Sequence, residues 1–197
     1  MSNIGVSRRI LARYHEMFNY GKHFGWRGGV ELNKASSVSQ AVKAALEDGD
    51  IKIVFQPILT ISGERCGFEA LSRFSNGCAP DAVWAHAQRR HLAVDLDRVA
   101  LPAAVNAAAR LEGCIFLNVS SGHFRDPDSL ARLASSGRVV WEVGERTFLT
   151  QEELQGVLQL KHQGYRIAMD DAGSGYSTVE RLHKLQPEIV KLDRSIV

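Results

Sequence analysis

The sequence has few cysteines, little excess charge and no long hydrophobic run. Its three cysteines, Cys66, Cys78 and Cys114, are odd in number and lack CxxC spacing, which favours buried thiols in a reducing compartment. A net charge of +2 over 197 residues is too small for a nucleic-acid-binding surface. No run approaches the roughly 20 apolar residues of a membrane span, and the N-terminus lacks a signal-peptide stretch. We therefore expect a cytoplasmic protein with no membrane span and no nucleic acid polymer as partner.

What the chain does contain is enough apolar content, 45%, for one domain with a real core. Residues 1–36 hold six Lys/Arg and two Asp/Glu, so we expect a basic extension there and the domain at 37–197. Within the extension, residues 5–20 predict a short amphipathic helix whose arginines form a solvated face rather than a membrane-binding one. Residues 21–37 are rich in Gly, Ser and Lys and predict a linker.

From residue 40 onward, helical and strand patterns alternate. Strands are expected at 52–58, 67–74, 114–120, 139–145, 166–171 and 188–197, and helices at 40–47, 81–90, 95–111, 127–135, 151–161 and 177–185. Ser37 or Ser39 would cap the first helix, and Thr150 with Glu153 forms a capping box before another. A short turn at Ser62-Gly63 joins the first two strands, whereas the later strands alternate with helices and are apolar on both faces.

That pattern indicates a parallel sheet covered by helices, either a closed barrel or an open doubly wound sheet. A TIM-like (β/α) barrel is preferred, although six strands are two short of the usual eight.

Acidic or amide side chains recur inside these apolar strands, each in the C-terminal half of its run. They are Glu69, Asn118, Glu142, Asp170 and Asp171. Burying a single carboxylate costs several kcal/mol, so the repetition makes sense if the strands converge on divalent cations. Hard oxygen ligands suit Mg²⁺ or Mn²⁺, and a bridging carboxylate would hold two ions roughly 3.5–4 Å apart. Lys191, in the last strand, would orient the attacking water or neutralise charge; the alternative is a set of separate salt bridges.

Other catalytic patterns are missing from the spacing. The seven histidines show neither an HExxH motif nor paired spacing. No Ser-His-Asp or Cys-His arrangement can be assembled from spacing alone. The Gly173-Ser-Gly175 segment is weak evidence for a nucleotide-cradling loop, and that reading is rejected.

Six segments, in a fixed order, carry a family resemblance. They are Phe55-Gln-Pro-Ile58, Gly67-Phe-Glu-Ala-Leu-Ser-Arg73, Leu117-Asn-Val-Ser120, Trp141-Glu-Val-Gly-Glu145, Ala168-Met-Asp-Asp-Ala-Gly-Ser-Gly-Tyr-Ser177 and Val190-Lys-Leu-Asp-Arg-Ser-Ile-Val197. Over roughly residues 38–197 the chain resembles the EAL domain, the cyclic di-GMP phosphodiesterase family. The EAL tripeptide alone would mean little, but six ordered motifs make chance agreement improbable.

The resemblance implies an EAL-type (β/α)8 barrel with an antiparallel first strand. It also implies hydrolysis of cyclic di-GMP to linear pGpG with two Mg²⁺ or Mn²⁺ ions. Carried over by motif, one ion is held by Glu69, Asn118, Glu142 and Asp170. Asp170 also bridges to the second ion, which Asp171 binds. Lys191 would contact the hydrolytic water, so that Glu69, Asp170, Lys191 and Glu145 are the expected catalytic residues.

The resemblance also assigns substrate-binding residues. Arg73 resembles the arginine that contacts the substrate phosphate, which suits a guanidinium. Gln56 resembles a residue on the guanine side of the pocket, and Leu71 of the EAL motif is placed with them. An ordinary rim salt bridge for Arg73 and strand-end capping by Gln56 stay open as alternatives.

Glu145 and the Asp171–Ser177 loop resemble the family's regulatory loop, which also contributes to dimerisation. The resemblance therefore implies a homodimer through this region. Ala172 and Gly144 replace the family's usual phenylalanine and threonine, changes that bear on loop packing and regulation rather than on metal binding.

The largest departure from the family lies at the end of the sequence. A seventh strand with another metal-binding glutamate and an eighth with a glutamine are missing, so the barrel is expected to be truncated after strand six. We expect open strand edges, a weak second metal site and weak turnover. The alternatives are a catalytically inactive cyclic di-GMP receptor or protein-interaction module, and a metal-free structural barrel fragment.

Overall fold

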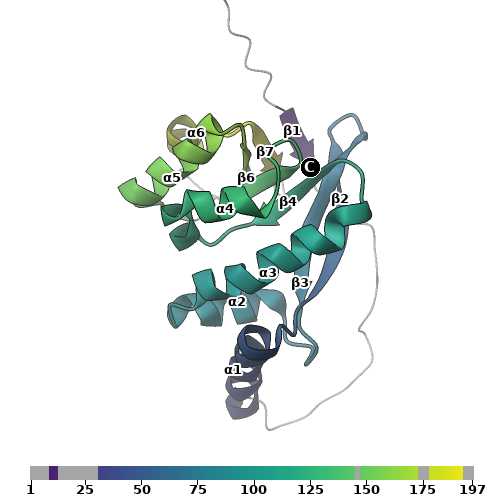
Figure 1. Ribbon diagram of the computed structural model, residues 1–197, viewed down its shortest axis with the longest axis vertical. Coiled ribbons are helices and arrows are strands. Elements are labelled where there is room, and N and C mark those ends of the chain that lie inside the picture. Colours follow the sequence, from purple (N-terminus) through teal and green to yellow (C-terminus); the bar gives the residue numbers. More distant parts are fainter. Residues whose placement is uncertain (1–8, 13–30, 145–146, 173–177, 193–197) are drawn as a thin grey trace, which may run out of the picture.

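The computed structural model describes residues 9–12, 31–144, 147–172 and 178–192. Its strands are β1 (Arg9–Ala12), β2 (Lys52–Thr60), β3 (Arg65–Arg73), β4 (Cys114–Asn118), β5 (Val139–Gly144), β6 (Arg166–Ala172) and β7 (Ile189–Leu192). Its α-helices are α1 (Glu31–Asp48), α2 (Pro80–Arg89), α3 (Ala93–Ala107), α4 (Pro127–Leu133), α5 (Gln151–His162) and α6 (Thr178–Leu185), with 3-10 turns η1 (Ala108–Arg110) and η2 (Ser121–Arg125). Helices and strands alternate from β3 onward (Figure 1).

The strands form a closed barrel in the order β1 to β7. Strand β2 pairs with β3 in antiparallel fashion, and β3 through β7 pair in parallel. This confirms the predicted (β/α) barrel with an antiparallel first strand and excludes the open doubly wound sheet. Among the described residues, no helix is long and apolar enough to cross a membrane.

The prediction of a helix within residues 5–20 is wrong where the structure describes that segment. Residues Arg9–Ala12 form β1, which runs parallel to β7 and antiparallel to β2; the rest of 5–20 lies outside the described residues. A short isolated helix is only marginally stable in water, whereas this segment can form backbone hydrogen bonds with two strand edges. Pairing with β2 and β7 therefore decides against the helix that the spacing of apolar residues predicted. The expected open edges of β2 and β7 are therefore both paired.

Helix α1 begins nine residues before the predicted start, at Glu31, so capping by Ser37 or Ser39 is wrong and the predicted linker overlaps the helix. Residues Ala41, Val42 and Ala45 of α1 pack with α2 and α3 in a separate small core, and Val38, ahead of the predicted start, packs against the same core. Gly49 ends the helix with φ 67°, as expected of a left-handed terminating residue.

The other predicted elements lie within a few residues of the observed ones, and the Thr150–Glu153 capping box of α5 is present. For the last predicted strand, 188–197, the structure shows β7, and residues 193–197 lie outside the described part.

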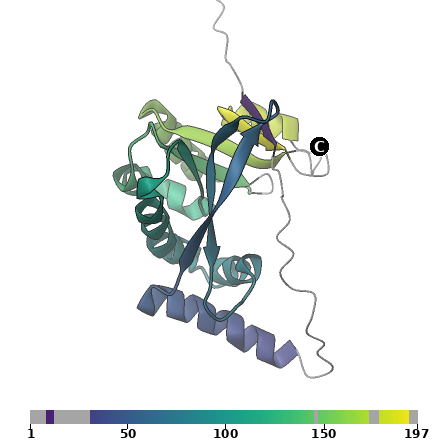
Figure 2. The ribbon, with the colours of Figure 1, turned by 90° about the vertical axis from the view of Figure 1, so that its right-hand side faces the viewer.

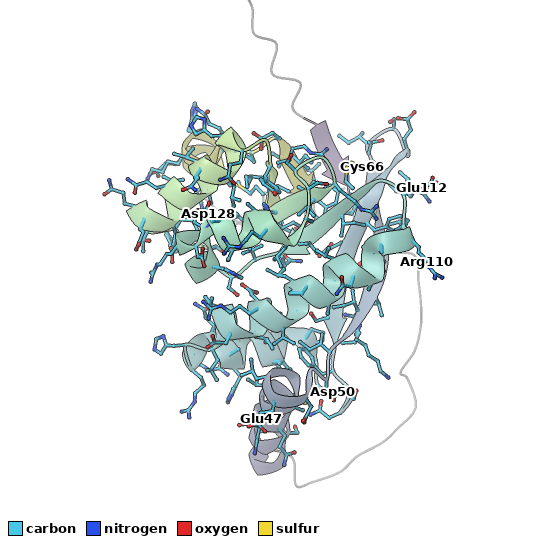
Figure 3. The ribbon with its side chains drawn as sticks, viewed as in Figure 1. Glu47, Asp50, Cys66, Arg110, Glu112 and Asp128 are labelled. Carbon is cyan, nitrogen blue, oxygen red and sulfur yellow. The ribbon has the colours of Figure 1, made fainter. Side chains whose placement is uncertain are left out.

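The main core lies between the outer face of the sheet and the helices α3 to α6. The β2–β3 hairpin runs past the short parallel strands toward α1 (Figure 2), with Asp50 near one end and Cys66 near the other (Figure 3). Where β3 meets β4 the backbones approach so closely that a Cβ at Gly67 would lie 2.2 Å from the Cys114 carbonyl oxygen. This contact seats β3, and the EAL motif two residues later, against the parallel strands.

Candidate active site

Alternation along the strands places two rings of side chains inside the barrel. The lower ring is apolar and consists of Ile58, Phe116, Val140, Ala168 and Ile189. Two residues further along four of these strands stand the polar residues Asn118, Glu142, Asp170 and Lys191. Because residues two apart on a strand face the same side, the polar ring must lie above the apolar one, at the carboxyl ends of the strands. Glu69 joins it from β3.

The polar ring is centred on the ammonium group of Lys191. Its Nζ lies 3.1 Å from Glu69 Oε2 and 2.9 Å from Asp170 Oδ1, and it also contacts Glu142 Oε1. Lys191 and Glu142 are each 1% exposed, Glu69 is 0% exposed and Asp170 is 7% exposed. Three carboxylates and one lysine thus meet in a buried site where the acidic charges outnumber the basic one.

This crowding changes the acidity of Glu142. Burial raises its pKa from 4.5 to about 8, and the charges of Glu69 and Asp170 act in the same direction while Lys191 opposes them. An added cation near these carboxylates would favour their ionised forms. The site is therefore short of positive charge.

A stability measurement can test this shift in metal-free protein. Between the ordinary pKa of 4.5 and about 8, the folded state keeps a proton on Glu142 that the unfolded state has released, so this group's contribution to stability falls as pH rises. We expect urea unfolding in EDTA to show that fall across the interval. Glu142→Gln should flatten it, and a wild-type curve no steeper than that of Glu142→Gln would contradict the assignment.

The other two predicted metal ligands, Asn118 and Asp171, differ from each other in position: Asn118 contacts the ring, and Asp171 lies outside the cluster of carboxylates. The Asn118 side-chain amide donates a hydrogen bond to Glu69 Oε1 at 3.0 Å, which brings Asn118 into the ring. Asp171 has φ 55°, and the β6–β7 register shifts between Met169 and Ala172. The chain thus leaves the regular pleat at Asp171, yet in the described structure the cluster of three mutually close carboxylates, Glu69, Glu142 and Asp170, does not include it.

The predicted substrate residues lie on the strands that lead out of this site. Leu71 and Arg73 follow Glu69 at intervals of two, so they share its face of β3. Arg73 is exposed, and its guanidinium donates to the Ser72 carbonyl. Gln56 is half-buried and is the register partner of Glu69 on β2. Glu145 and residues 173–177 of the predicted loop lie outside the described residues.

Sequence reasoning missed two buried polar side chains beside the site, Asp97 and its neighbour His123. Asp97 is 0% exposed and lies on the apolar stripe of α3, which is formed by Ala93, Leu96, Ala100, Leu101 and Ala104. Its Oδ2 accepts the Ser120 backbone N–H at 3.0 Å and lies 3.2 Å from His123 Nδ1. Burial raises the pKa of Asp97, and the contacts with His123 and Ser120 oppose that rise. The sequence signal was an acidic residue at a helical position whose neighbours at three and four residues are apolar.

The residues of the ring fit a divalent metal ion. Oxygens of Glu69, Glu142 and Asp170 lie within 4.8 Å of one another. Within the described structure, Glu142 Oε1 and Asp170 Oδ1 contact the Lys191 ammonium, and the buried Glu142 Oε2 accepts no hydrogen bond. Buried carboxylate oxygens without hydrogen bonds are costly and are the ligands that Mg²⁺ and Mn²⁺ prefer.

Comparison with known proteins gives relatives over most of the chain. PdeG of Escherichia coli (strain K12), described as a probable cyclic di-GMP phosphodiesterase, is 30% identical over 189 residues, covering 84% of this chain and 37% of PdeG. PdeD of the same organism, with the same description, is 25% identical over 175 residues, covering 81% of this chain and 33% of PdeD. The chain thus spans about a third of the length of these curated relatives.

Solved structures share the fold. The PaMucR phosphodiesterase in complex with c-di-GMP has a TM-score of 0.67 at 24% identity, with 80% of this chain and 72% of that chain covered. The FimX EAL domain from Pseudomonas aeruginosa bound to c-di-GMP has a TM-score of 0.63 at 22% identity, with the same coverage of 80% and 72%. The EAL domain family is matched by residues 39–197, which include the barrel from β2 to β7 and the whole polar ring. The chain therefore belongs to the EAL domain family.

Proposed function

We propose that residues 37–197 act as a cyclic di-GMP-specific phosphodiesterase domain in bacterial second-messenger signalling in the cytoplasm. The reaction adds one water across a P–O bond of the cyclic dinucleotide and opens it to linear pGpG. The observation that carries the proposal is the buried convergence of Glu69, Glu142 and Asp170 at the carboxyl ends of the strands. In barrels of this type that end is where catalysis takes place.

The ligands would divide between two ions, Mg²⁺ or Mn²⁺. Glu69, Asn118, Glu142 and Asp170 would hold the first, and Asp170 with Asp171 the second. When bound, such ions lower the pKa of water and stabilise charge that develops on the phosphate. The buried carboxylates exclude bulk water from this point and hold their oxygens in a fixed arrangement, which strengthens electrostatic interactions with anything placed between them.

The remaining residues would bind and orient the substrate. The Lys191 ammonium would donate a hydrogen bond to the attacking water and keep its own proton. Arg73 lies on the same face as Glu69, about 13 Å further along β3, where its guanidinium would bind a phosphodiester oxygen pair. Leu71 between them and Gln56 on β2 would line the guanine side of the pocket.

The test is a hydrolysis assay in which pGpG is separated from cyclic di-GMP by chromatography, with Mn²⁺ and with EDTA. We expect slow, EDTA-sensitive formation of pGpG, because only Asp170 and Asp171 are assigned to the second ion. Saturable binding without pGpG, unaffected by Asp170→Asn, would instead favour the inactive receptor or protein-interaction module. The PaMucR and FimX structures, both described with c-di-GMP, support this choice of ligand.

We further propose a homodimer through the region that follows β6, predicted above as Asp171–Ser177. In support, Phe148, between β5 and α5, is 85% exposed. It lines a cavity of about 150 Å³ together with Met169 of β6 and residues of α6, the elements that precede and follow the proposed region. The Arg181 guanidinium lies 5.4 Å from the centre of the Phe148 ring. Such an exposed aromatic ring is typical of an anchor at a protein interface.

Phe148→Ser should therefore shift the chain from dimer toward monomer in sedimentation experiments, while the metal site keeps its affinity for Mn²⁺. The matched control is Ile61→Ser, since Ile61 is also exposed, at 66%, but lies in the β2–β3 turn. Equal sedimentation of wild type and Phe148→Ser would contradict this interface.

A further inference from the structure

The candidate for a further role is Asp97, whose buried carboxylate is not explained by the proposed chemistry. Within the described residues it forms no ion pair with lysine or arginine, and its titratable neighbour is His123. Its Oδ1 accepts no hydrogen bond in the described structure. A carboxylate kept at such cost on the apolar stripe of a helix needs a compensating structural task.

That task is visible where β4 ends. Strand β4 stops at Asn118, and the Val119 N–H makes only a long hydrogen bond of 3.4 Å to the Glu142 carbonyl. The next N–H, that of Ser120, donates to Asp97 Oδ2 at 3.0 Å instead of to a neighbouring strand. Helix α3 thus supplies the hydrogen-bond partner at the point where the chain leaves the sheet.

This contact lies two residues from Asn118. The Asn118 amide in turn donates to Glu69 Oε1 at 3.0 Å inside the polar ring. Two peptide units leave few soft dihedral angles between Asn118 and the anchored Ser120. The direction in which the Asn118 side chain points is therefore coupled to the Asp97–Ser120 hydrogen bond.

Asp97 is itself fixed by a second contact. His123 is buried; its Nδ1 faces Asp97, and its Nε2 lies 3.0 Å from Ser129 Oγ. The order Asp–His–Ser resembles a hydrolase triad, but the Ser129 hydroxyl donates its proton to the Asp126 carbonyl at 2.9 Å. That proton is therefore not directed at His123, as it would be in a triad. The chain of contacts holds Asp97 in place and does not make a nucleophile.

We propose that Asp97 is a positioning residue for the metal and substrate site: through the Ser120 N–H it sets the exit of β4 and so the placement of the Asn118 amide. Asp97 touches neither ion nor substrate. The effect of Asp97 on catalysis rests on the proposed function. Its effect on the position of the Asn118 amide does not, and can be measured in metal-free protein. A charged acceptor suits this role because it forms a stronger hydrogen bond to a backbone N–H than a neutral one.

The experiment compares five proteins: wild type, Asp97→Asn, Ser120→Pro, Ser120→Ala and Tyr165→Phe. Ser120 has φ −65°, which proline adopts, so Ser120→Pro deletes the N–H donor at a compatible backbone angle. Ser120→Ala keeps the N–H and removes only the hydroxyl, which contacts Asp97 and lies 3.5 Å from the Ala93 carbonyl, so it is the control for loss of the side chain alone. Tyr165→Phe is a second control, because it removes buried hydrogen bonds to the Ala131 and Ala134 carbonyls, ahead of the start of β6.

Two readouts are needed. In EDTA, the NMR resonances of the Asn118 side-chain amide should shift in Asp97→Asn and Ser120→Pro, and should stay in place in both controls. Titration with Mn²⁺ alone should show affinity about tenfold weaker in the same two variants, the size typical of residues that orient a metal ligand. Tyr165→Phe should lower the unfolding temperature without changing Mn²⁺ affinity.

The outcomes separate the two proposals. Unchanged Asn118 resonances in Asp97→Asn and Ser120→Pro would overturn the positioning role, and so would shifted resonances with Mn²⁺ affinity within twofold of wild type. Shifted resonances in a protein that binds no Mn²⁺ would retain the geometric role and overturn the proposed metal-dependent function instead. Shifted resonances with weakened Mn²⁺ affinity support both.

Discussion

Asp170→Asn should reduce kcat/KM for cyclic di-GMP by about 10³-fold, the loss expected when roughly 4 kcal/mol of metal-assisted stabilisation disappears from the transition state. Asp170 is the one carboxylate assigned to both ions, and the structure places its Oδ1 in the ring with Glu69 and Glu142, 2.9 Å from Lys191 Nζ. The measurement is initial-rate pGpG formation at saturating Mn²⁺.

The matched control is Asp128→Asn. Asp128 is exposed on α4 and accepts hydrogen bonds from Gln159 and Gln163, so the same chemical change there should leave the rate unaltered. A rate for Asp170→Asn within tenfold of wild type would contradict the assignment of Asp170 as a bridging ligand.

Lys191→Met should have the largest effect on stability, and that effect should depend on metal. In metal-free protein the substitution removes the ammonium that contacts Glu69, Glu142 and Asp170. Loss of one partner from a buried charge cluster costs about 3–5 kcal/mol, equivalent to roughly 10 °C in unfolding temperature for a chain of this size. Mn²⁺ at about 100 times its Kd would restore about 2.7 kcal/mol.

We therefore expect Mn²⁺ to raise the unfolding temperature of Lys191→Met more than that of wild type, in which lysine and ion act on the same carboxylates. Lys161→Met is the control. Lys161 pairs with Glu188 and donates to the Leu185 carbonyl, so its loss should lower stability in a way that Mn²⁺ does not reverse. A similar Mn²⁺ response in wild type and Lys191→Met would show that the ammonium does not compete with the ion.

Much of the fold was predictable because most elements carry their own local signals. Apolar runs separated by helical patterns predicted β2 to β7, and the Thr150–Glu153 capping box predicted the start of α5. The predictions failed where distant partners decide the structure. Segment Arg9–Ala12 is a strand because it pairs with both β2 and β7. In α1, Val38 lies ahead of the predicted helix start and packs against the small core that α1 shares with α2 and α3. No pattern within either segment records those partners.

The candidate site, too, was predictable from the sequence only in part. The recurrence of polar residues near the ends of apolar strands was enough to group Glu69, Asn118, Glu142, Asp170 and Lys191, because side chains at equivalent depths of a parallel barrel face one interior. It did not reveal Asp97, since the burial of a helix position depends on which face of the helix meets the sheet.

The sequence by itself determined the alternation of strands with helices, the residues of the polar ring and the family. Side-chain direction alternates strictly along a strand, so residue type and spacing suffice for these features. Only the tertiary structure decided that Lys191 lies at the centre of the carboxylates, that Asp171 stands apart from them, and that α3 anchors the exit of β4. Those outcomes depend on register and helix rotation, which are set by packing among segments far apart in the chain.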